Sequence, residues 1–212
     1  MSVTQEERNG LYWTHVDWEL KNVTPDMIDW FWSNMEKGYI LWHPAQHSDL
    51  IWAVKPNDKF IGAIHVAPQK WSDGTPFAPH IRFDDVASLA PEVGDVIVYE
   101  HAVAVAAIAL FEKDFKPDNP IIAYRIHQWE KTDFGVRGRS SAIPVTEDPL
   151  EGKERGQVWA KHAGEECGNW GVFLPGLYNL YDVVKERPEV NPFHSLRVAR
   201  DGKKLSYPDM KK

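Results

Sequence analysis

Cysteine is almost absent from this sequence: Cys167 is the only one among 212 residues. An internal disulfide is therefore excluded, and so is a zinc site built from several thiolates, because both require at least two cysteines. Any metal ion would have to be bound by histidine, aspartate or glutamate side chains.

Basic residues are also in short supply. The 24 Lys and Arg residues face 31 Asp and Glu residues, which gives a net charge of −7, and the basic residues are dispersed along the chain. This pattern argues against a nucleic-acid-binding surface. No apolar run is long enough to span a membrane, and residues 1–8 are polar and acidic, unlike a signal peptide. We expect a cytoplasmic protein without nucleic-acid or membrane partners.

Composition shows no break, so we expect one domain over residues 1–212, with its core at about 20–187 and an extended tail at 188–212. The ten tryptophans are a high number, and several stand near histidines, such as Trp42 beside His43. Such side chains suit the lining of a pocket for a planar, partly polar ligand. An aromatic-rich core is the alternative.

The first regular element is predicted at residues 24–38, where Thr24 is a suitable N-cap, Pro25 suits the first helical position and Gly38 suits the C-cap. His43 and His47 follow, on either side of Pro44, which disfavours further helix. These two histidines are either turn residues or members of a site.

The residue pattern of the chain after the first helix predicts a sheet followed by a helix. Residues 95–111 are ambiguous, because 102–110 could be helical, but the valines favour a strand. A helix is predicted over 154–187, bent near Pro175, with Gly164, Gly168 and Gly171 allowing close approach. We place strands near 50–54, 60–67, 79–84, 95–111, 120–130 and 134–145. This order predicts an α+β, helix-grip fold of the START or pollen-allergen type: a curved antiparallel sheet around a long C-terminal helix, enclosing a cavity.

His162 and Glu166 are four residues apart in the predicted C-terminal helix, so they share a face, and that face continues through apolar Val158, Trp170 and Phe173. A carboxylate in a buried row stays ionised only if it is paired, hydrogen-bonded or bound to a metal. A solvated His–Glu pair is the alternative. The metal hypothesis predicts that His47, His162 and Glu166 converge on one point.

Several pieces of the chain resemble, in the same order, the diacetylphloroglucinol hydrolase family, which includes phloretin hydrolase. The resemblance extends from about residue 20 to 182, and its pieces lie at 24–32, 37–47, 126–129, 135–139, 162–166 and 173–178. It implies a helix-grip cavity with bound zinc, and hydrolysis of a carbon–carbon bond between an acyl group and a phloroglucinol-type or polyketide ring in secondary metabolism.

Carried over residue by residue, the resemblance implies that His47, His162 and Glu166 are zinc ligands. It further implies that Tyr39 contacts the substrate and that His127 touches a substrate hydroxyl. Tyr39 could instead only cap the first helix, and His127 could be a strand residue facing water. In the retro-Claisen reaction that the family implies, Glu165 or another acid would carry the proton.

The chain departs from the family at the fourth zinc ligand, a glutamate, in whose place Gln69 stands. Glutamine is a poor zinc ligand, so Asp73, His65 or His80 substitutes, three residues hold the metal, or the metal is lost. Loss of metal would favour a cyclase, an isomerase or a carrier of a small aromatic or polyketide ligand. The chain also lacks a longer family segment before the first helix that is linked to dimerisation, so a homodimer stays open.

Overall fold

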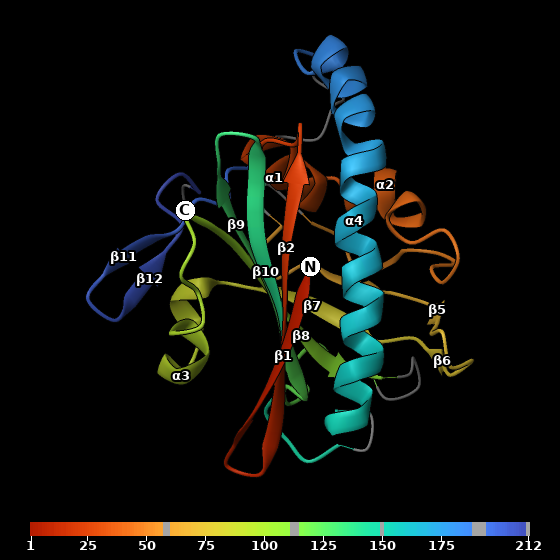
Figure 1. Cartoon of the computed structure of the whole chain (residues 1–212), viewed down its shortest axis with the longest axis vertical. Helices are drawn as coiled ribbons and strands as arrows, with labels where there is room; N and C mark the ends of the chain where they lie inside the picture. Colours follow the sequence, from red (N-terminus) through yellow and green to blue (C-terminus); the bar gives the residue numbers. More distant parts are fainter. Residues whose placement is uncertain (57–59, 111–114, 149–150, 188–193, 211–212) are drawn as a thin grey trace.

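The computed structural model describes residues 1–56, 60–110, 115–148, 151–187 and 194–210. Its main feature is an eight-stranded antiparallel sheet with the order β1-β2-β10-β9-β8-β7-β4-β3 (Figure 1). The strands are β1 Ser2–Arg8, β2 Leu11–Lys21, β3 Ile51–Val54, β4 Ile64–Val66, β7 His80–Asp84, β8 His101–Ala109, β9 Ala123–Lys131 and β10 Gly135–Pro144. The strands predicted from the sequence are confirmed, with shifted ends.

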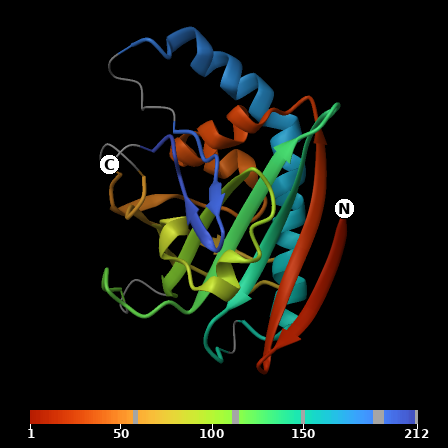
Figure 2. The same cartoon turned by 90° about the vertical axis from the view of Figure 1, so that its left-hand side faces the viewer.

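One long helix, α4 (Lys153–Val184), lies along one face of the sheet and contacts mainly β2, α1 and α2 (Figures 1 and 2). The two short helices α1 (Pro25–Ser33) and α2 (Met35–Trp42) pack beside it. Aromatic side chains join these helices: Trp42 stacks on Trp170 of α4 at 5.3 Å, and Phe31 meets the same ring edge-on at 5.6 Å. The space between the helices and the sheet is therefore walled largely by aromatic rings.

The first helix departs from its prediction. Thr24 is the N-cap, as expected, and accepts a hydrogen bond from the Met27 amide at 3.3 Å. The helix is interrupted at Asn34, whose backbone angles leave the helical region, and Gly38 is not the C-cap but lies within α2. A Cβ at Gly38 would lie 3.0 Å from the Phe31 ring, so the glycine permits close packing instead of ending the helix.

The N-terminal part of the sheet was not predicted, and the core does not start near residue 20. Strands β1 and β2 form a hairpin whose turn, Asn9–Gly10, has φ values of 53° and 81°. Asn-Gly is the preferred pair for such a turn because both residues accept positive φ. Strand β2 then buries Trp13, Val16 and Trp18.

The C-terminal tail is also more than an extended segment. Strands β11 (Ala199–Asp201) and β12 (Lys204–Ser206) form a hairpin that covers the sheet face opposite α4, together with α3 (Pro91–Gly94) (Figure 2). Leu205 and Tyr207 are buried there, and the Tyr207 hydroxyl donates to the Ala102 carbonyl at 3.0 Å. Because this layer covers its outer face, all nine residues of β8 are buried.

Of the predicted range 95–111, the described residues 95–110 contain strand β8 and not a helix. Helix α4 continues through Pro175, with its last part turned away from the rest (Figure 2). Of the glycines expected to bring α4 close to other groups, Gly164 does so, because a Cβ there would lie 2.6 Å from Met1 Sδ, whereas Gly168 faces open space. Gly156 is a further close approach that the sequence did not predict: a Cβ there would lie 2.3 Å from Thr14 Oγ1. Short strands β5 (Gln69–Lys70) and β6 (Pro76–Phe77) and the 3₁₀ turn Val86–Ser88 complete the fold.

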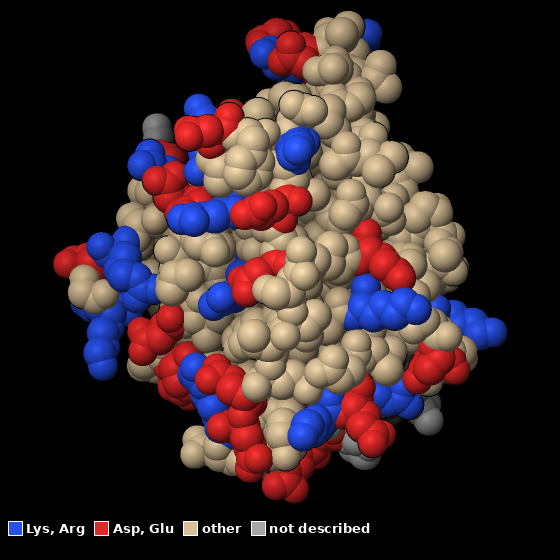
Figure 3. Space-filling model, in the orientation of Figure 1, with Lys and Arg blue, Asp and Glu red and all other residues tan. Residues whose placement is uncertain are grey.

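The surface matches the dispersed charge of the sequence. On the face drawn in Figure 3, basic and acidic side chains alternate and do not gather by sign. Within the described part of the chain, no helix is both long and apolar enough to cross a membrane.

Gly138, on β10, offers a test of this packing. A Cβ there would lie 2.2 Å from the Trp18 ring and 2.5 Å from the Gln128 carbonyl oxygen, so Gly138→Ala is expected to lower the free energy of unfolding by about 1–3 kcal/mol. Denaturant titration measures the change. The control is Gly168→Ala, where a Cβ meets open space and the substitution should be neutral or stabilising. Equal stability of Gly138→Ala and wild type would contradict the described packing.

Candidate metal centre and cavity

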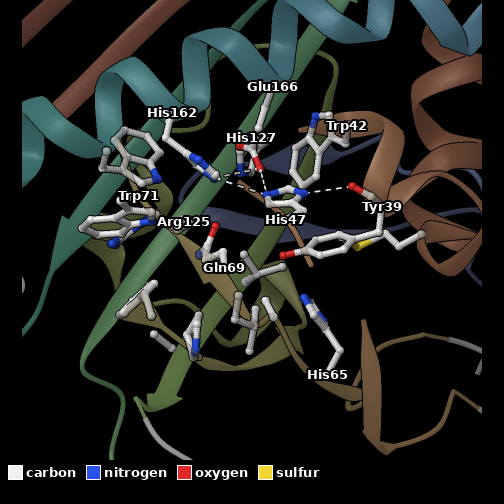
Figure 4. Close-up of a pocket in the computed structure, with 18 of the residues that line it drawn as sticks. Tyr39, Trp42, His47, His65, Gln69, Trp71, Arg125, His127, His162 and Glu166 are labelled. Atoms are coloured by element: carbon white, nitrogen blue, oxygen red, sulfur yellow. Dashed lines mark hydrogen bonds and ion pairs between the residues drawn. The ribbon is translucent and has the colours of Figure 1, made fainter. Parts of the chain in front are cut away.

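Three side chains from two separate parts of the chain converge beneath α4. His47 lies in the turn after α2, whereas His162 and Glu166 are one turn apart on α4. Nε2 of His47 and Nε2 of His162 each lie 3.1 Å from Glu166 Oε1, and the two Nε2 atoms are 3.4 Å apart (Figure 4). The convergence that the sequence predicted is confirmed.

These separations match a zinc site. Three atoms spaced by 3.1, 3.1 and 3.4 Å can all lie at about 2.0–2.1 Å from a single point, which is the usual zinc–ligand distance. All three side chains are buried, and two imidazoles with a carboxylate are ordinary zinc ligands. The donor set therefore fits the metal that the sequence analysis expects.

The outer hydrogen bonds of the two histidines favour the same conclusion. Nδ1 of His47 donates to the Tyr39 carbonyl at 2.8 Å, and Nδ1 of His162 donates to Gln46 Oε1 at 2.9 Å. A neutral imidazole that donates from Nδ1 keeps a lone pair on Nε2. In that neutral form both Nε2 lone pairs are available to a metal ion, and carbonyl acceptors orient the two rings as they orient metal-binding histidines.

Glu166 is held in its ionised form. Burial alone would raise the pKa of its carboxyl, but the charges and hydrogen bonds that His162 and His47 supply when they are protonated outweigh burial and hold that pKa well below its ordinary value. A buried carboxylate with this preference is a ready ligand for a cation.

The cluster belongs to the lining of a cavity between α4 and the sheet (Figure 4). Most of the lining is aromatic or aliphatic, which suits a flat organic ligand. The described lining residues are Trp32, Met35, Tyr39, Trp42, His47, His65, Ala67, Gln69, Trp71, Phe77, Pro79, Ile81, Val105, Ala107, Arg125, His127, Trp159, His162 and Glu166.

Two further predicted residues, Tyr39 and His127, are brought to the same cavity. The Tyr39 ring stacks on His47 with centroids 4.0 Å apart, and its hydroxyl points into the cavity (Figure 4). Burial, and secondarily the charge of Glu166, raise the pKa of Tyr39 well above its ordinary value, so the phenol stays protonated and can donate. Tyr39 is thus not only a cap of the first helix.

His127 lies on β9 and is buried, so it does not face water. Burial lowers its pKa to about 4, with Glu166 acting in the opposite direction and Arg125 and His162 adding to the decrease. Its Nδ1 is 2.9 Å from Ser140 Oγ, which also accepts from Trp18 Nε1 at 3.1 Å. These contacts fix the ring and leave Nε2 for a ligand.

Gln69 occupies a position that makes it relevant to the metal. Its backbone pairs with that of His47 in an isolated antiparallel bridge, and its side chain lines the cavity. The side-chain oxygen Oε1 is buried and has no hydrogen-bond partner among the described residues. An orphaned carbonyl oxygen beside the cluster is a group that a cation would satisfy.

The other proposed fourth ligands are placed differently. His65 lines the cavity, whereas Asp73 and His80 do not. Asp73 is exposed and forms an ion pair with Arg155, and His80 stacks on Phe115 with centroids 4.4 Å apart. Of the three residues, only His65 therefore remains near the cluster.

Glu165 is not brought into the cavity. Its side chain is 43 % exposed, and its carboxylate accepts from Nε2 of His43 at 2.8 Å. The His43 ring stacks on His162 with centroids 4.8 Å apart, so Glu165 reaches the cluster only through another residue.

Two functional candidates, Gln46 and Arg125, are not predicted from the sequence, and His43, for which a turn role and a site role were both open, lies beside the cluster through its stacking on His162. Gln46 and His43 belong to the same Trp-His-Pro-Ala-Gln-His motif as His47, which was the available signal. Arg125 had a weaker signal, since it precedes His127 by two residues on a predicted strand and therefore shares its face.

Comparisons with known proteins agree with this architecture. A family model described as "DAPG hydrolase PhiG domain" matches residues 5–142. No curated protein matches the chain. Among solved structures, protein Ms6760 from Mycobacterium smegmatis is 14 % identical, with 82 % of this chain and 97 % of that chain covered and a TM-score of 0.51. Major latex-like protein 151 from Panax ginseng is 10 % identical, with 78 % and 99 % covered and a TM-score of 0.52. At these identities the likeness concerns the fold alone, and it confirms the helix-grip prediction.

Proposed function

We propose that this chain, which belongs to the DAPG hydrolase PhiG domain family, is a zinc-dependent hydrolase that cleaves the carbon–carbon bond between an acyl group and a phloroglucinol-type or polyketide ring. The single observation that carries the proposal is the convergence of the Nε2 atoms of two buried imidazoles on a buried carboxylate in the lining of an aromatic cavity.

In this proposal His47, His162 and Glu166 hold the metal, and the Gln69 side-chain oxygen is the fourth group facing it. A bound zinc ion supplies a Lewis acid that polarises an acyl carbonyl and makes water acidic enough to act as a nucleophile near neutral pH. Gln46 and the Tyr39 carbonyl keep the two imidazoles oriented.

Side chains that do not bind the metal position the aromatic ring of the substrate. Tyr39, protonated and buried, donates to one ring oxygen, and Nε2 of His127 is available to a second ring hydroxyl. Trp32, Trp42 and Trp159 wall the cavity and exclude bulk water from the acyl–aryl bond. Direct proton transfer from Glu165 to the substrate is not part of the proposal, because Glu165 does not line the cavity.

A metal-free carrier or cyclase is not favoured, because such a protein does not need His47, His162 and Glu166 to converge on one point. Metal analysis of the purified protein, combined with an assay on an acylated phloroglucinol, tests the proposal. We expect about one zinc ion per chain, release of the free acid and the deacylated ring, and loss of both zinc and cleavage after chelation. Metal-free protein that binds the ring compound unchanged would overturn it.

A further inference from the structure

Arg125 is the only lysine or arginine among the described residues that line the cavity (Figure 4). It lies on β9, two residues before His127, so both side chains leave the same face of the sheet about 7 Å apart. Its side chain is 12 % exposed, which places a permanent cation in a mainly aromatic wall.

Neighbouring groups hold the Arg125 guanidinium in one place. Nη2 donates to the two carboxylate oxygens of Glu151 at 2.7 and 3.0 Å, and Nη1 donates to the Tyr124 carbonyl at 3.2 Å. The guanidinium also lies 5.3 Å from the centroid of the Trp159 ring. A guanidinium has five N–H groups, and these hydrogen bonds use three of them, so two can serve a further acceptor.

Stability does not explain a charge in this place. The Glu151 side chain is 4 % exposed, so both members of the pair are buried. Buried ion pairs contribute little net stability, and apolar replacements of similar volume are often neutral or stabilising. The charge of Arg125 does act inside the cavity, since it contributes to the low pKa of His127, after burial.

We propose that Arg125, held by Glu151, is an anion-binding subsite of the cavity, so that preferred substrates carry a carboxylate or a phenolate near the acyl–aryl bond. The inference deepens the proposed function by assigning a charge to its substrate. A guanidinium matches the planar, two-oxygen geometry of an oxyanion, and an aromatic wall screens their attraction less than water does. A carboxylate would belong to the acyl chain, and a phenolate to the ring.

Titration calorimetry with the purified protein shows whether the bound anion is a carboxylate of the acyl chain or a phenolate of the ring. The carboxylate probe is phloroglucinol carrying a succinyl group, compared with its methyl ester. The phenolate probe is monoacetylphloroglucinol, measured below and above the pH at which its first phenol ionises. We expect the wild type to bind one anionic form about 10- to 100-fold more tightly than its neutral counterpart. Absence of both preferences would overturn the proposal.

The variant test removes the pair together, because Arg125→Met alone would leave Glu151 buried and unpaired. R125M/E151M should abolish the preference for the anion while keeping the affinity for the neutral form. R125Q/E151Q, which can form a hydrogen bond between neutral amides, should give the same result. It is measured in place of the first variant if that variant does not fold. A folded variant that still binds the anionic form more tightly than the neutral form would overturn the proposal.

The matched control is R137M/E130M, which removes an Arg–Glu pair between β9 and β10 that does not line the cavity, and it should keep the preference for the anion. Zinc content is measured on the same samples. Zinc-free protein that still prefers the anion would refute the proposed hydrolase but not the subsite. A zinc-dependent hydrolase without any anion preference would refute the subsite alone.

Discussion

Replacing His162 with alanine is expected to lower zinc affinity by more than about 100-fold and to abolish acyl–aryl cleavage. Loss of a group that only orients a ligand typically costs 10- to 100-fold in metal affinity, so loss of a ligand should cost more. The two remaining donors, His47 Nε2 and Glu166 Oε1, are 3.1 Å apart and cannot complete a zinc site by themselves.

The His162→Ala protein should nevertheless fold. Glu166 keeps its contact with His47, and the loss of a partner for Gln46 costs about 1–3 kcal/mol. Zinc at 100 times the wild-type dissociation constant should stabilise the wild type by about 2.7 kcal/mol, and the same zinc concentration should stabilise the variant by no more than about 0.4 kcal/mol. Melting curves with and without zinc measure this difference.

Lys161→Ala is the matched control, because Lys161 is the exposed neighbour of His162 on α4 and does not line the cavity. It should bind zinc and cleave substrate like the wild type. Unchanged zinc binding by His162→Ala would show that the ion is held elsewhere.

Replacing Gln69 with glutamate should tighten zinc binding by at least about tenfold, because a charged oxygen is a far better ligand than an amide oxygen. The position is suitable: Gln69 is bridged to His47 through the backbone, and its Oε1 is buried without a partner among the described residues. Without zinc the same substitution should lower the melting temperature, since it adds a second buried carboxylate near Glu166.

The Gln69→Glu substitution is expected to have opposite effects without zinc and with zinc. A lower melting temperature without zinc and a larger zinc-induced rise support a metal facing Gln69. Lost stability with no gain in zinc affinity would reject that placement. Gln157→Glu, an exposed glutamine of α4 outside the cavity, is the control and should leave zinc affinity unchanged.

Local signals explain which elements were predictable. Thr24 and Pro25 mark the start of α1 because capping depends on neighbouring residues alone, and the strands at β7, β9 and β10 follow from β-branched and aromatic runs. The Asn9–Gly10 turn is an equally local signal for the β1–β2 hairpin. Gly38 misled the helix prediction because its role is to accommodate the Phe31 ring, a contact made in three dimensions.

The sequence by itself determined the ligand types: one cysteine excludes a thiolate site, and the i, i+4 spacing puts His162 and Glu166 on one helix face. Tertiary structure alone decided that His47 joins them, that Gln46 orients His162, and that Glu165 stays outside the cavity. It also decided that Arg125 pairs with Glu151 and that its guanidinium lies against the Trp159 ring. The physical reason is that helix periodicity is local, whereas packing of α2, α4 and β9 around one cavity joins residues more than a hundred positions apart.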